Sequence, residues 1–140
     1  MAKKKPKRTW VGAPRKPTPS AVPDDLKAEV EAKAKGLIQD FLKPTYVKPP
    51  PKDKRWNYLT GISAKWHRSF FYFVGHYASP GPDALSPTFE SRFARMEYAG
   101  DRRFHLAYFR HTGKWWEVYR DLTPDEAIET IRDHGIFHPA

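Results

Sequence analysis

The chain has 140 residues, no cysteine and a formal net charge of +9. This length suits a single domain, and the absence of cysteine excludes a disulfide framework, a thiol nucleophile and Cys-ligated metal sites. No apolar run approaches the roughly 18–20 residues that a membrane span requires, and the first residues lack the apolar core of a signal peptide. We therefore expect a soluble cytoplasmic protein, or a nuclear one if the cell is eukaryotic.

The positive charge is concentrated at the start of the chain. Residues 1–20 carry seven basic side chains and no acidic one, a net charge of +7, whereas the remaining 120 residues carry 18 basic and 16 acidic side chains and net only +2. Residues 1–22 also lack apolar periodicity, so they cannot bury enough apolar surface to offset the entropy of ordering them. The sequence predicts a disordered basic tail over residues 1–22 and one domain over residues 23–140.

The first helix is predicted to begin at Asp24 and Asp25. Apolar side chains then recur at helical spacing on one face, at Leu26, Val30, Ala34, Leu37, Ile38, Phe41 and Leu42. Pro44 is expected to end this helix, because the residue before a proline is displaced from the α region. The proline-rich segment 43–54 is interpreted as a stiff extended connector, and an SH3-type ligand is the less favoured alternative.

Five strands are predicted next, because 17 of the 21 aromatic residues lie between Trp56 and Tyr119. Their expected ranges are 56–66, 69–78, 90–99, 103–110 and 114–121, with a loop over residues 78–87 that is marked by proline and glycine. The apolar residues between 66 and 77 also fit a helical stripe, but the run FFYFV favours a strand.

A second helix is predicted after the last strand. Thr123 is the expected N-cap, Pro124 the first helical residue and Glu126 the partner in a capping box, and Gly135 marks the C-terminal end. Ala127, Ile128 and Ile131 form its apolar stripe. The order helix, five strands, helix predicts an α+β fold: a five-stranded antiparallel meander sheet with the N-terminal and C-terminal helices packed on one sheet face.

Turn chemistry sets the expected register of the last three strands. Thr112 is poorly suited to a type I′ turn, which favours a type I turn over Arg110–Gly113 with a left-handed Gly113 in a G1 bulge. This turn pairs Phe109 with Trp115, Tyr108 with Trp116, Leu106 with Val118 and His105 with Tyr119. The preceding turn can close in two registers; the favoured one pairs Tyr98 with Phe104, Glu97 with His105, Met96 with Leu106 and Arg95 with Ala107. The alternative is rejected because it would bury Arg95 and Glu97 in the apolar face.

This register separates the side chains into two faces. The apolar face, predicted to be core, carries Ala94, Met96, Tyr98, Phe104, Leu106, Tyr108, Trp116 and Val118. The mixed face is the candidate ligand-binding surface, and its residues are Phe93, Arg95, Glu97, His105, Ala107, Phe109, Trp115, Glu117 and Tyr119. Trp115 and Trp116 are thus expected in different environments, because neighbouring strand residues point to opposite faces.

The mixed face allows three interpretations. Aromatic side chains interleaved with a few polar groups resemble the wall of a small-molecule pocket, and a histidine near carboxylates can support acid–base catalysis. The same aromatics suit a protein–protein adaptor surface. The third interpretation is a half-solvated sheet face with cross-strand charge pairs, and it is the favoured one. We expect no metal or cofactor, and no serine hydrolase site, because Ser63, Ser69, Ser79, Ser86 and Ser91 lie in no nucleophile elbow.

The basic tail suggests a nucleic-acid partner. Its cations are Lys3, Lys4, Lys5, Lys7, Arg8, Arg15 and Lys16, and such clusters bind phosphates without reading sequence. A merely solubilising tail is the alternative. We expect a small non-enzymatic binding or accessory protein whose tail contacts nucleic acid, with a small-molecule binder or enzyme as the second hypothesis and an adaptor as the third.

Overall fold

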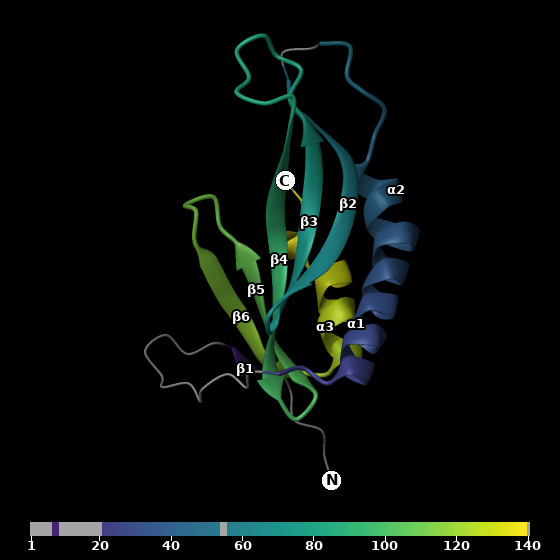
Figure 1. Cartoon of the computed structure of the whole chain (residues 1–140), viewed down its shortest axis with the longest axis vertical. Coiled ribbons are helices and arrows are strands. Elements are labelled where there is room, and N and C mark those ends of the chain that lie inside the picture. Colours follow the sequence, from purple (N-terminus) through teal and green to yellow (C-terminus); the bar gives the residue numbers. More distant parts are fainter. Residues whose placement is uncertain (1–6, 9–20, 54–55, 140) are drawn as a thin grey trace.

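The computed structural model describes residues 7–8, 21–53 and 56–139. The helical elements are α1 (Asp24–Leu37), the π-helical turn η1 (Ile38–Leu42), α2 (Lys43–Tyr46), α3 (Pro124–Asp133) and the 3-10 turn η2 (Gly135–Phe137). The strands are β1 (Lys7–Arg8), β2 (Tyr58–His67), β3 (Phe70–Ala78), β4 (Thr88–Gly100), β5 (Arg103–Phe109) and β6 (Trp115–Leu122). Both long helices lie on the same side of the sheet (Figure 1).

The sheet confirms the predicted α+β fold. Its strand order is β1-β6-β5-β4-β3-β2, so β2 to β6 form an antiparallel meander. The segment between residues 66 and 77 forms the β2–β3 hairpin, as predicted, and no helix. The two-residue strand β1 extends the sheet beyond β6 by pairing Lys7 with Arg120 and Arg8 with Tyr119.

Ordered structure reaches into the segment that was predicted to be a disordered tail. Lys7 and Arg8 belong to a strand, and Val22 is buried in the hydrophobic core. The prediction of disorder for residues 1–6 and 9–20 falls outside the described residues.

The prediction that Pro44 ends the first helix is wrong. The chain stays helical from Asp24 to Tyr46 by passing through the π-helical turn, in which the Lys43 N–H bonds to the Ile38 carbonyl five residues back. Proline normally disrupts a helix because it lacks the N–H for an i−4 bond and its ring meets the i−4 carbonyl. The wider π turn shifts the hydrogen-bond register directly before Pro44, so the helix tolerates the proline.

The C-terminal helix begins as predicted. The Thr123 hydroxyl accepts from the Glu126 N–H (3.2 Å), and the Glu126 carboxylate accepts from the Thr123 N–H (2.9 Å). Pro124 is the first residue of α3, and its missing N–H costs nothing at that position. This reciprocal cap fixes where β6 ends and α3 turns back over the sheet.

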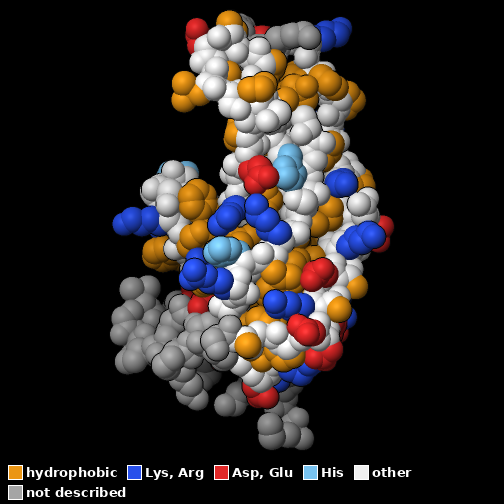
Figure 2. Space-filling view, in the orientation of Figure 1, with side chains coloured by type: hydrophobic (Ala, Val, Ile, Leu, Met, Phe, Trp, Pro, Cys, Tyr) orange, Lys and Arg blue, Asp and Glu red, His pale blue; other side chains and the backbone are white. Residues whose placement is uncertain are grey.

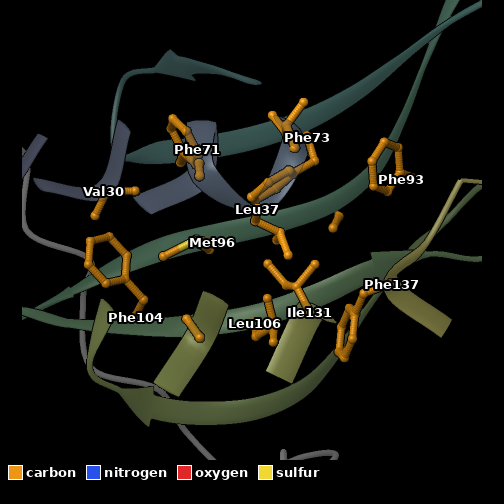
Figure 3. Close-up of a cluster of buried hydrophobic side chains, with 14 of the residues drawn as sticks. Val30, Leu37, Phe71, Phe73, Phe93, Met96, Phe104, Leu106, Ile131 and Phe137 are labelled. Atoms are coloured by element: carbon orange, nitrogen blue, oxygen red, sulfur yellow. The ribbon is translucent and has the colours of Figure 1, made fainter. Parts of the chain in front are cut away.

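The hydrophobic core lies between the helices and the sheet (Figure 3). Val30 and Leu37 of α1 and Ile131 of α3 pack against Phe71, Phe73, Met96, Phe104 and Leu106 of the strands. Fully burying each such side chain stabilises the fold by about 1.5–3 kcal/mol. We call the sheet surface under the helices the covered face and the opposite surface the open face.

The predicted register is confirmed for β4–β5 and for the first part of β5–β6. All four predicted pairs between β4 and β5 form, as do Phe109–Trp115 and Tyr108–Trp116. Gly113 has a φ of 84° and its N–H bonds to the Arg110 carbonyl, as the type I turn with a G1 bulge requires. The other two pairs are wrong: irregularities after Glu117 place Tyr119 opposite Leu106 and Leu122 opposite Phe104.

Candidate functional site

The open face combines arginine with aromatic side chains. Tyr72 of β3 is paired directly with Arg95 of β4, and Phe70 with Glu97, so these four side chains share the open face. In Figure 2, basic and histidine side chains gather beside hydrophobic ones over β4 and β5. The sequence prediction placed Arg95, Glu97, His105, Phe109, Trp115 and Glu117 here, and the register keeps all six on this face.

Arg95 is the centre of this arrangement. Its guanidinium lies 4.9 Å from the ring centre of Phe70 and 4.8 Å from that of Trp115, so two aromatic rings from β3 and β6 flank one cation. Desolvation lowers the pKa of Arg95, while Glu97, Tyr72 and Glu117 act in the opposite direction. Arginine remains charged in proteins, and this site therefore holds a fixed cation that is partly withdrawn from water.

Further aromatic contacts extend the arrangement across the face. The Arg92 guanidinium lies 4.2 Å from the ring centre of Tyr72, and the Tyr72 ring lies 5.6 Å from that of Trp115. Trp115 also meets Phe109 edge-on at 5.2 Å. Tyr72 and Trp115 belong to β3 and β6, which are separated by two strands. Their rings can nevertheless approach each other, because the β5 residue between them on this face, Ala107, has a small side chain. We call Phe70, Tyr72, Arg92, Arg95, Phe109 and Trp115 the arginine–aromatic cluster.

Acidic groups lie beside this cluster. Glu97 is only 6% exposed and stands opposite His105 in the register, within the field of Arg95. The Glu117 carboxylate lies 3.5 Å from the Arg120 Nε and 4.0 Å from the His105 Nδ1. The His105 Nδ1 accepts a hydrogen bond from the Asp121 N–H (3.3 Å). Arg95 and Arg120 are the cations beside these carboxylates: Arg95 shares β4 with Glu97, Arg120 shares β6 with Glu117, and Glu117 also acts on Arg95 across the sheet.

Two predicted residues of the mixed face lie elsewhere. A bulge in β4 pairs Phe73 with Ala94 and Val74 with Arg92, which turns the extra residue Phe93 into the core, 6.1 Å from the Phe73 ring. The irregular end of β6 turns Tyr119 toward the helices, where its ring lies 5.9 Å from that of His134. Alternation alone could not predict these changes, because each bulge reverses the side-chain order.

Trp116 was predicted to be core, and this prediction is wrong. It lies on the helix side of the sheet as the register requires, but it is 44% exposed and Arg110 covers part of its ring at 4.7 Å. The correct strand face did not guarantee burial.

The sequence reasoning missed Phe70, Tyr72 and Arg92 as members of the cluster. Phe70 and Tyr72 could have been predicted from the register between β3 and β4, in which they are opposite Glu97 and Arg95. The sequence analysis aligned only the last three strands, so this pairing was not considered. The predicted nucleic-acid ligands Lys3, Lys4, Lys5, Arg15 and Lys16 lie outside the described residues. For Lys7 and Arg8 the structure describes the backbone pairing with β6.

Charge is divided between the two layers of the fold. The helices α1, η1, α2 and α3 carry nine acidic and five basic residues, a net charge of −4. From Tyr58 to Leu122, the chain from β2 to β6 carries six acidic and nine basic residues, a net charge of +3. The sheet layer is therefore the side of the domain that attracts anions.

Pockets lined by described residues lie away from the cluster. One of about 300 Å³ lies between α1 and the edge strand β2, and two of about 450 and 400 Å³ lie near Asn57 at the far end of the sheet. Within the described ranges, no group of three or more metal-ligating side chains comes together. In the same part of the chain, no helix is long and apolar enough to cross a membrane.

Comparison with protein families gives one match, over residues 22–139, to a family described as a domain of unknown function, DUF3024. The chain belongs to this family. Curated proteins and solved structures give no match. The DUF3024 domain thus begins at the buried Val22 and includes the whole arginine–aromatic cluster, whereas residues 1–20, with their charge of +7, precede it.

Proposed function

We propose that this protein binds single-stranded nucleic acid, which it holds on the open face with the help of the basic tail. The observation that carries the proposal is Arg95 between the rings of Phe70 and Trp115. Proteins that bind single strands without reading sequence combine cations for the phosphates with aromatic platforms for the bases. The arginine–aromatic cluster supplies both in one place.

The exposure of the cluster suits stacking. Phe109 is 42% exposed, and Phe70 and Trp115 are partly exposed, so bases can reach ring faces or edges. Tyr72, at 7%, and Arg95 instead form the floor that holds the outer rings in place. Stacking on such rings is worth about 1–3 kcal/mol per base.

The charge distribution supports the same partner. The net charge of +3 on the sheet layer and −4 on the helical layer favours an anion that approaches from the open side. Pairing of Lys7 with Arg120 joins the basic tail to β6, the strand that carries Trp115. A phosphate backbone that leaves the cluster toward β6 therefore approaches the strand with which the backbone of Lys7 and Arg8 pairs.

The proposal can be tested by fluorescence anisotropy with a labelled oligothymidylate of about 20 nucleotides and with a duplex of equal length. We expect the single strand to bind more tightly than the duplex, and binding to weaken steeply as salt rises. A protein adaptor would bind neither probe. Equal binding of both probes would assign the affinity to the tail alone and contradict the role of the open face.

Matched variants locate the binding surface. Phe109→Ala and Arg92→Ala, both on the open face, should each weaken binding roughly 5- to 100-fold, the range expected for one stacked base or one phosphate contact. Arg132→Ala removes an exposed arginine from α3 in the helical layer and should have no effect. Lys3, Lys4 and Lys5 changed together to Gln should lower the salt dependence. If Arg132→Ala weakens binding as much as Arg92→Ala, the open face is not the site.

A further inference from the structure

A serine, a histidine and a glutamate lie in line on three neighbouring strands. The Ser63 Oγ of β2 is 2.6 Å from the His76 Nε2 of β3, and the His76 Nδ1 is 3.8 Å from the Glu90 Oε1 of β4. Ser63 and His76 are partly exposed and Glu90 is exposed, so the group is accessible to small molecules. It lies outside the arginine–aromatic cluster.

The strand register explains how these residues meet. His76 is directly opposite Glu90, and Ser63 is opposite Val74, which places it diagonally next to His76. Diagonal neighbours on one sheet face come within reach of each other when one side chain is long. No local motif predicted the group, because the three residues are spread over 28 positions, from 63 to 90, and no nucleophile elbow accompanies them.

We propose that Ser63, His76 and Glu90 form a hydrolytic site for small carboxylic esters. A hydroxyl that is held by an imidazole, with a carboxylate near the second imidazole nitrogen, is the arrangement that activates a serine nucleophile. The other Glu90 oxygen lies 3.3 Å from the Lys65 Nζ. Ser63 is the nucleophile and His76 the general base. Glu90 is a positioning residue that favours the His76 tautomer with the proton on Nδ1, which leaves Nε2 free to accept the Ser63 proton.

The strand faces limit the kind of substrate. Ser63 is opposite Val74, and its neighbour on β2, Ile62, is in the core, so the Ser63 hydroxyl and His76 lie on the open face. The pocket of about 300 Å³ between α1 and β2, whose wall includes Ile62 and Phe71, lies on the covered face and does not receive an acyl group from this side. A partly exposed group of this kind suits small activated esters.

The reaction balances with water as the co-reactant. The Ser63 Oγ bonds to the carbonyl carbon while its proton moves to the His76 Nε2. The bond to the leaving oxygen then breaks, and the alcohol departs with that proton. Water attacks the acyl-serine, gives a proton to His76, and the Ser63 oxygen leaves with it to release the acid. No oxidant, reductant or metal is required.

The first measurement is hydrolysis of p-nitrophenyl acetate and butyrate by the full chain, together with mass spectrometry of the product labelled by a fluorophosphonate. We expect turnover of both esters and a label on Ser63. Ser63→Ala and His76→Ala should each lower kcat/KM by roughly 10²-fold or more. Glu90→Gln should lower kcat more than it changes KM, and Glu90→Asp should restore part of the loss.

Ser79→Ala is the matched control, because Ser79 donates its hydroxyl to the Asn57 side chain rather than to a histidine. It should retain full activity. All variants are to be compared by thermal melting so that loss of activity is not loss of fold. Two results would overturn the proposal: a Ser63→Ala variant as active as the parent, which would reveal simple imidazole catalysis, or labelling of Ser79 to the same extent as Ser63. Neither result bears on nucleic-acid binding, which uses other residues.

Discussion

The two faces of the five-stranded meander differ in the kind of side chain that they bury. On the covered face, Phe71, Met96 and Phe104 are buried among apolar neighbours, and the helices exclude water from them. On the open face, the buried groups include Glu97 and the partly buried Arg95, which burial alone would destabilise. The open face retains these charges because each has partners of opposite sign or aromatic rings beside it.

Stability alone accounts for the side chains of one face and not for those of the other. Apolar packing explains the residues of the covered face, whereas a stable open face does not require the Arg95 guanidinium between two aromatic rings. Buried charged groups add little stability compared with apolar replacements of similar volume. The arginine–aromatic cluster is therefore the part of the sheet on which the proposal of nucleic-acid binding rests.

The largest expected effect comes from removing a ring from the covered face. Phe104→Ala deletes a side chain that is 0% exposed and should lower the free energy of unfolding by about 3–5 kcal/mol. Phe109→Ala removes the same ring from the exposed part of the open face and should cost less than about 1 kcal/mol. Urea denaturation of both variants measures the contrast. Similar losses in the two would mean that the open face is packed like a core.

Much of this contrast could be predicted from the sequence. The strand ranges, the α3 capping box and the β4–β5 register follow from local patterns such as Thr123 with Glu126 and Gly113 in its turn. These features depend on residues a few positions apart, which is where sequence patterns are most informative. Seven of the nine residues predicted for the mixed face accordingly lie on the open face.

The errors have one physical origin in common, because each depends on contacts between distant segments. The bulge that turns Phe93 inward depends on how β3 and β4 pair. Tyr119 changes face because the adjacent residues Ala107 and Leu106 of β5 pair with Glu117 and Tyr119 of β6, which leaves one extra residue between them. Trp116 is 44% exposed although it lies on the face that the helices cover elsewhere. The Ser63–His76–Glu90 group depends on three strands at once.

Trp115 and Trp116 provide the second test of the comparison. Trp115 contacts Arg95, Tyr72 and Phe109, so Trp115→Ala should cost about 1–2 kcal/mol of stability as well as weaken nucleic-acid binding. Trp116 is 44% exposed, and Trp116→Ala should cost less than about 1 kcal/mol and leave binding unchanged. Paired denaturation and anisotropy titrations of the two variants measure this order. A larger stability loss for Trp116 would show that the hairpin tip is buried after all.

The smallest expected effect concerns an exposed ion pair on the helical layer, which contrasts with the enclosed charges of the open face. The Lys33 Nζ lies 2.6 Å from the Asp125 Oδ1 and links α1 to α3. Its hydrogen bond to Asp125 raises the pKa of Lys33. Lys33→Met should nevertheless cost at most about 1 kcal/mol, because exposed pairs are screened by water and salt. Lys35→Met, an exposed lysine of the same helix, is the control.

The pH dependence of this pair has a definite sign. A raised folded-state pKa means that the native protein holds the Lys33 proton more tightly than the unfolded chain does. The contribution is therefore fully present at neutral pH, below the unfolded pKa of about 10.4, and is lost as the pH rises through the folded value. Thermal melting of the parent and of Lys33→Met should differ slightly at pH 7 in low salt and converge at strongly alkaline pH or in high salt. A difference that persists in high salt would mean that the Lys33 methylenes, rather than its charge, join the helices.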